Sequence, residues 1–163
     1  MKRIDSHQHF WQLSRGDYSW LSEDLGVLYR DFLPTDLKKE LSYANVSETV
    51  LVQAADTLAE TEFMFAQAFN QKFISAVVGW VDMECPDVLT QLSWFMENPY
   101  FKGIRPMIQD IEDVNWMLKP ELTPIFEFLE DNFLSFDALV LPKHLANLQT
   151  LLTRHPKLRV VID

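Results

Sequence analysis

The sequence has few of the residues on which several common binding sites depend. It contains 4 glycines in 163 residues and no GxGxxG or GxxxxGK[ST] pattern, so we expect no glycine-rich cradle for nucleotide phosphates. Cys85 is its single cysteine, which excludes an intramolecular disulfide and a CxxC metal site. No run approaches the ~20 apolar residues of a membrane span, and no basic-then-apolar leader precedes the first predicted strand.

Basic residues are scarce as well. The chain has 14 Lys and Arg against 24 Asp and Glu, for a formal net charge of −10. Because phosphate backbones are bound by clustered Lys and Arg, we expect no nucleic-acid partner. We interpret the charge as a solvated acidic surface. Together with the lone cysteine and the lack of a membrane span, it favours a reduced, cytoplasmic, soluble protein without a membrane partner.

Apolar residues are plentiful and regularly spaced. They make up 48% of the chain, with 13% aromatic residues, which suffices for one domain over 1–163. Six runs rich in Val, Ile and Leu read as strands covered on both faces. These runs are 3–10, 48–54, 74–82, 101–108, 134–141 and 159–163. Helix-period segments lie between them, one of them opened by a capping box of Thr57 and Glu60. The alternation predicts an α/β fold with a parallel sheet.

The longest predicted connection, residues 10–33, is rich in aromatic side chains. It contains Trp11, Tyr18, Trp20 and Tyr29. Long loops without regular structure are uncommon in compact domains and are often functional. We therefore expect an active-site loop here.

Two of the 4 histidines, His7 and His9, lie one residue apart at the end of the first predicted strand. Because side chains alternate along a strand, Asp5, His7 and His9 should share one face. Two imidazoles on one face can converge on a metal ion, or one can bind substrate while the other orients it. Satisfied core histidines are the structural alternative, and the D-x-H-x-H pattern at a strand end favours function. His144 and His155 are not expected to be ligands, and we expect His155 to be solvated.

Other polar residues stand near the ends of later strands. Gln53 ends the second strand, and Trp80 and Asp82 share a face at the end of the third. Each has a structural alternative: a hydrogen bond at the sheet end, plain core, and a helix N-cap respectively. Arg105 lies among apolar strand residues and must be paired, and its fork suits a carboxylate or a polarised carbonyl oxygen. Asp137, early in the fifth strand, is either structural or functional.

The segments "IDSHQHFW", "DFLPTDL", "TVLVQAADTLAET", "VVGWVDM", "KGIRPMIQD", "WMLKPEL" and "RVVID" occur in this order over residues 2–163. As a set they resemble the amidohydrolase-related sugar lactonases, a family that includes L-fuconolactonases and L-rhamnonolactonases. The resemblance implies a (β/α)8 barrel and the hydrolysis of an aldonolactone to its hydroxy acid. His7 and His9 match the family's first-strand pair, and Arg105 matches the arginine of its GxR motif.

The resemblance also implies roles for the other candidates. His7 and His9 would hold a divalent ion such as zinc or manganese, or act directly, and Arg105 would stabilise the oxyanion or grip the substrate. Trp80 and the aromatic loop, including Trp20, would cover the sugar ring. The family continues after "VVID" with a histidine and two further strand–helix units. Those units carry an aspartate, the expected general base, so this sequence reads as an incomplete barrel of about six units.

Three alternatives stay open. One is another enzyme on the same barrel, such as a metal-dependent decarboxylase. A TatD-like nuclease is a second, which the acidic charge disfavours. The third is a non-catalytic fragment that serves as a structural or interaction module. An incomplete barrel would also expose sheet edges, so we expect self-association and no lactonase activity from the 163 residues alone.

Overall fold

A computed structural model describes residues 2–163, which form two compact units. The first unit ends at Trp80, and the second spans Val81–Asp163. The two units are consecutive along the chain. The expectation of a single domain over 1–163 stays a prediction.

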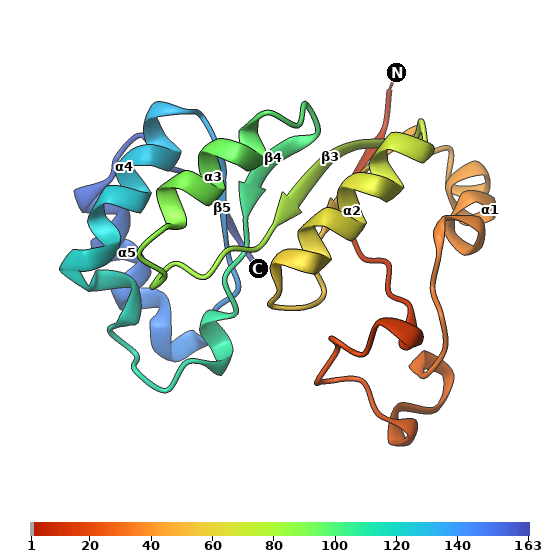
Figure 1. The fold of residues 1–163 in the computed structure, drawn as a ribbon, viewed down its shortest axis with the longest axis horizontal. Coiled ribbons are helices and arrows are strands. Elements are labelled where there is room, and N and C mark those ends of the chain that lie inside the picture. Colours follow the sequence, from red (N-terminus) through yellow and green to blue (C-terminus); the bar gives the residue numbers. More distant parts are fainter. Residues whose placement is uncertain (1) are drawn as a thin grey trace. The chain divides into compact units, whose positions relative to one another are not determined.

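The first unit alternates strands and helices around a parallel sheet (Figure 1). Its elements are β1 (Ile4–Gln8), α1 (Pro34–Ala44), β2 (Glu48–Val52), α2 (Leu58–Asn70) and β3 (Ile74–Gly79). β2 pairs in parallel with β1 and with β3. The β1–β2 register is irregular between Asp5 and Gln8. The order of these three strands in the sheet therefore follows their order in the sequence.

The second unit continues the same alternation. Its elements are α3 (Val88–Met96), β4 (Phe101–Ile104), α4 (Thr123–Asp131), β5 (Ser135–Ala138), α5 (Leu145–Arg154) and β6 (Arg159–Ile162). β5 pairs in parallel with β4 and with β6. All six predicted strands are therefore present, each inside its predicted range.

One position shows why a strand needs its glycine. A Cβ on Gly103 of β4 would lie 2.0 Å from Ser135 Oγ and 2.4 Å from the Ser135 carbonyl oxygen on β5. No side chain fits at such distances, because the two backbones approach too closely. Gly103 thus fixes the spacing of the strands beside Arg105.

The cap predicted at the start of α2 forms only in part. Thr57 Oγ1 accepts the Glu60 N–H at 3.1 Å, as the capping box predicts. The Glu60 side chain does not complete the box. Its Oε1 accepts the Ala54 N–H at 3.0 Å and its Oε2 accepts the Tyr18 hydroxyl at 3.0 Å. The helix therefore begins where the sequence predicts, while Glu60 serves a tertiary contact.

The prediction that His155 is solvated is wrong. The residue is buried, and its Nδ1 lies 3.2 Å from Glu130 Oε2. Its ring packs 5.4 Å from the ring of Phe126, which in turn meets Phe136 edge to face. Its position at a helix end just before a proline suggested exposure, but Glu130 and Phe126 of α4 pack against the ring.

Among the described residues, the helices are too short and too polar for any of them to cross a lipid bilayer.

Candidate active site

His7 and His9 converge at the carboxyl end of β1. Their Nε2 atoms lie 2.9 Å apart, and their rings meet edge to face with centroids 4.7 Å apart. Asp5 is on the same side, where its carboxylate accepts the His7 N–H at 3.2 Å. The prediction that the two histidines share a face is confirmed, even though the register of β1 is irregular at this point.

The hydrogen bonds of His9 define its tautomer. Its Nδ1 lies 2.8 Å from the Val52 carbonyl oxygen, which can only accept, so Nδ1 carries the proton. In the neutral ring the lone pair is then on Nε2, directed toward His7. A backbone acceptor on the far nitrogen is the usual partner of a metal-ligating histidine. The pair is thus oriented to share a cation between two imidazole nitrogens.

The donor set fits a divalent ion in part. Zn–N bonds of ~2.0–2.1 Å can span the separation of the two Nε2 atoms. Catalytic zinc ordinarily takes three protein ligands. Within residues 2–163, no group of three or more His, Cys, Asp or Glu side chains is placed to hold a metal ion. His7 and His9 alone would therefore be an incomplete ligand set for catalytic zinc.

The end of β2 gathers two further candidates. Gln53 is fully buried, and its N–H donates to the Val78 carbonyl at 2.9 Å. Trp20 reaches the next residue, because its indole N–H donates to the Ala54 carbonyl at 2.7 Å. The rest of the indole stays accessible, since Trp20 is 40% exposed. The aromatic loop thus places the Trp20 indole close to the end of β2, where the Val52 carbonyl bonds His9.

The aromatic loop is closed at its base. Trp11 and Phe32 form an antiparallel bridge with two backbone hydrogen bonds of 3.0 Å. Short 3₁₀ turns at Leu13–Arg15 and Glu23–Leu28 shape the segment between them. The loop also borders a pocket of about 340 Å³, which His9 and Phe10 line together with residues of α1.

Trp80, the last residue of the first unit, is held by its backbone. Its N–H donates to Thr61 Oγ1 at 2.9 Å, and the Thr61 hydroxyl donates back to the Trp80 carbonyl at 3.1 Å. Thr61 itself is fully buried on α2. Sequence analysis did not single out this threonine, because nothing local marks one buried hydroxyl on a helix.

In the second unit, Arg105 has the partner that its buried position requires. The side chain is 7% exposed, and its Nη1 lies 2.6 Å from Asp163 Oδ2. Asp163 is fixed in turn, since its N–H donates to the Ala138 carbonyl at 3.0 Å. The predicted pairing of Arg105 is confirmed, with the carboxylate supplied by the residue that follows β6.

Asp82 and Asp137 both make local contacts. Asp82 is exposed, and its Oδ1 accepts the Glu84 N–H at 2.9 Å, which caps the turn before α3. Asp137 is buried and accepts the Ser135 hydroxyl at 3.0 Å. The Ser135 contact fits the structural alternative for Asp137, whereas Asp82 is not the predicted helix N-cap, because Asp87 takes that position at α3. A substrate-binding role for Asp82 stays a prediction, as does convergence of the two units' candidates on one pocket.

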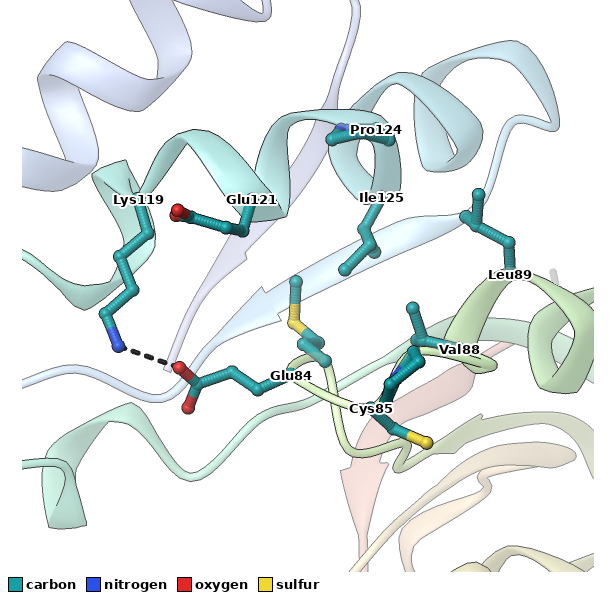
Figure 2. A pocket seen from close by; sticks show the side chains of 10 residues that line it. Glu84, Cys85, Val88, Leu89, Lys119, Glu121, Pro124 and Ile125 are labelled. Carbon is teal, nitrogen blue, oxygen red and sulfur yellow. Dashed lines mark hydrogen bonds and ion pairs between the residues drawn. The ribbon is translucent and has the colours of Figure 1, made fainter.

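The larger of the pockets described, about 620 Å³, lies in the second unit between the loop before α3 and the start of α4 (Figure 2). Its interior is apolar, with Met83, Val88 and Ile125. Glu84 borders it and bonds Lys119 at 2.7 Å. None of the predicted site residues lines this pocket.

Comparison with known proteins identifies the family. The amidohydrolase family model matches residues 4–163. An L-fucono-1,5-lactonase from Burkholderia ambifaria is 42% identical over 161 residues, which are 99% of this chain and 56% of that protein. An L-fucono-1,5-lactonase from Burkholderia multivorans is 32% identical, over 99% of this chain and 54% of its own length. The chain thus spans a little over half the length of these curated relatives.

A solved structure confirms the fold class. It is an amidohydrolase from Burkholderia multivorans with bound zinc, 31% identical, with a TM-score of 0.90 over 98% of this chain and 56% of that one. The six strands with their helices thus have the incomplete (β/α)8 arrangement that the sequence predicts. On the family match over nearly its whole length, the chain belongs to the amidohydrolase family.

Proposed function

We propose that this chain supplies the first six strands of a lactonase that opens a sugar-derived lactone, such as L-fucono-1,5-lactone, to its hydroxy acid. The observation that carries the proposal is the facing Nε2 atoms of His7 and His9 at the end of β1. The identity to L-fucono-1,5-lactonases over 99% of the chain supports the choice of substrate.

Lactone hydrolysis is acyl transfer to water. A water oxygen bonds to the carbonyl carbon, the ring C–O bond breaks, and the ring oxygen leaves as a hydroxyl after taking a proton. His7 and His9 would hold a divalent ion, zinc or manganese, which when bound supplies Lewis-acid polarisation and an acidified water. The hydrogen bond from His9 Nδ1 to the Val52 carbonyl orients the ring for this role.

The remaining candidates bind and orient the substrate. Arg105 would stabilise the oxyanion or grip a substrate oxygen, with Asp163 holding the guanidinium in place. Trp20 and Trp80 would cover the apolar face of the sugar ring, and Gln53 and Asp82 would bind its hydroxyls. The general base is expected from an aspartate that these 163 residues do not include. We also propose a cytoplasmic location, supported by the free thiol of Cys85.

The test joins this chain to the remaining part of the Burkholderia ambifaria lactonase and follows pH drop on L-fucono-1,5-lactone. The fusion should hydrolyse the lactone with added zinc or manganese. His7→Asn and His9→Asn should each lower kcat/KM by ~100-fold or more. Glu62→Gln, an exposed change on α2, serves as the matched control. A folded fusion without turnover would contradict the proposal, and so would histidine variants that match the control.

A further inference from the structure

The aromatic loop buries few of its side chains, although the Trp11 ring contacts those of Trp20 and Phe32. Among the described residues between Trp11 and Phe32, which close the loop, Tyr18 is the one with a buried side chain. The Tyr18 ring packs on Ala54 and Ala55, just beyond β2. Residues 22–30 are all exposed. A segment with so few buried apolar side chains also needs specific polar contacts to keep one conformation.

Those contacts come from a polar cluster between the loop and the first turns of α2. Arg15 lies at its centre, with Nη2 2.5 Å from Asp17 Oδ2 and 3.3 Å from Glu60 Oε2. Its guanidinium also lies 4.3 Å from the centre of the Phe63 ring. Arg15 Nε donates to the Tyr18 hydroxyl at 3.1 Å. Charged hydrogen bonds of this kind are strong where water is excluded.

Glu60 connects this cluster to the candidate active site. Its side chain is fully buried, and both oxygens are used. Oε2 accepts the Tyr18 hydroxyl, whereas Oε1 accepts the Ala54 N–H at 3.0 Å. The Ala54 carbonyl accepts the Trp20 indole N–H at 2.7 Å. One carboxylate therefore holds the loop and the backbone residue to which Trp20 is attached.

The same stretch of backbone also orients one histidine of the proposed metal site. Val52, two residues before Ala54, supplies the carbonyl that orients His9. Displacement of the Ala54 backbone would move the Trp20 indole relative to the histidine pair. Burial raises the pKa of Tyr18, so its hydroxyl remains a donor to Glu60 at neutral pH.

We propose that Glu60 is a positioning residue. Through its contacts with Tyr18, Arg15 and Ala54, here called the latch, it holds the aromatic loop in one conformation. The Trp20 indole then lines one side of the site for the lactone ring in a fixed position. The inference rests on the proposed function for the identity of the ligand. The latch itself rests on contacts within the first unit. Glu60 touches no reacting atom in this scheme, so it acts on substrate binding through the loop.

The first readout is hydrogen exchange of the 163-residue chain. In Glu60→Gln the amide oxygen can still accept the Ala54 N–H, but its NH₂ cannot accept from Tyr18 or Arg15. Tyr18→Phe removes only the hydroxyl. Both variants should accelerate amide exchange over 11–32 by about tenfold or more, with β2 exchange unchanged. Glu62→Gln, an exposed change on the same helix, should leave the loop at the wild-type rate.

The second readout separates positioning from general stability. In the lactonase fusion, Glu60→Gln should raise KM for L-fucono-1,5-lactone by about tenfold with kcat nearly unchanged. In a Trp20→Phe background the same change should add little, because both act through the indole. Loop exchange equal to that of Glu62→Gln would overturn the latch. Additive effects on KM would overturn the link to Trp20. A fusion without lactone hydrolysis contradicts the proposed function alone, and the exchange data still decide the latch.

Discussion

His144 shows how one buried side chain can couple stability to pH. The ring is fully buried, and its Nδ1 accepts the Leu141 N–H at 3.0 Å. An imidazolium has no free lone pair, so protonation must break this bond. Burial lowers the pKa of His144, and the neighbouring Lys143 charge lowers it further. The folded state therefore holds the ring neutral.

The expected consequence is a loss of stability in acid. Because the folded pKa lies below the unfolded value of ~6.5, the fold binds fewer protons than the unfolded chain. The contribution of His144 is present above that pH and is lost as the pH falls through the folded pKa. His144→Asn keeps an acceptor for the Leu141 N–H without titrating. Urea unfolding at one protein concentration, from pH 8 to 5, should show a smaller acid loss for the variant. Parallel curves would contradict this reading.

Thr61 carries a second prediction for a single residue. Its hydroxyl is the partner of both the N–H and the carbonyl of Trp80. Thr61→Val keeps the shape but leaves two backbone groups without this partner. We expect unfolding to be easier by about 1–3 kcal/mol, measured by denaturant titration. Thr90→Val on the exposed face of α3 is the matched control and should change little. Equal midpoints for both variants would show that Thr61 does not hold Trp80.

At the scale of elements, Arg105 joins the end of β4 to the residue after β6. In the fusion protein, Arg105→Lys should lower lactone hydrolysis by ~10-fold or more, because it removes the guanidinium fork that bonds Asp163 and that we propose to bind a substrate oxygen. Arg154→Lys, an exposed change on α5, is the control. Unchanged turnover would remove Arg105 from the mechanism, whereas loss of turnover with unchanged KM would place its role in the transition state.

The elements themselves could be predicted from local pattern. Apolar runs separated by helix-period segments located six strands, because strands covered on both faces are hydrophobic throughout. His7 and His9 could be placed on one face because side chains alternate along a strand. Glu60 shows where local pattern fails. Its position three residues after Thr57 predicts a cap, yet its oxygens bond Ala54 and Tyr18. No spacing rule reports a contact 42 residues away in sequence.

His155 fails for a related reason. A polar residue before a proline at a helix end is usually solvated, but burial is decided by what packs above it. Here Glu130 and Phe126 of α4 cover the ring. The partner of Arg105 was predictable as a chemical type, a carboxylate, but its identity as Asp163 depends on β4 and β6 both pairing with β5.

For the whole molecule, the chain spans a little over half the length of its curated relatives, and the metal site that we propose at His7 and His9 would need further ligands. Within the second unit, the described pairing of β6 is with β5, and Val161 and Ile162 are 46% and 66% exposed. An exposed apolar strand can pair with a strand of another molecule, which promotes association. We therefore expect the isolated 163 residues to self-associate or to require a partner that completes the sheet.

The same reasoning predicts that the isolated 163 residues are not an active lactonase. Within residues 2–163, no third ligand accompanies the pair that we propose to bind a metal ion, and the expected general base lies outside these residues. Loss of such groups commonly costs several powers of ten in rate. The assay follows pH drop on L-fucono-1,5-lactone with purified chain, with and without zinc or manganese, beside light scattering for association. Adding the separately made remainder of the Burkholderia ambifaria lactonase should restore turnover and monomeric behaviour together. A monomeric chain that turns over ~1–1000 times per second by itself would show that these residues already contain the complete catalytic set.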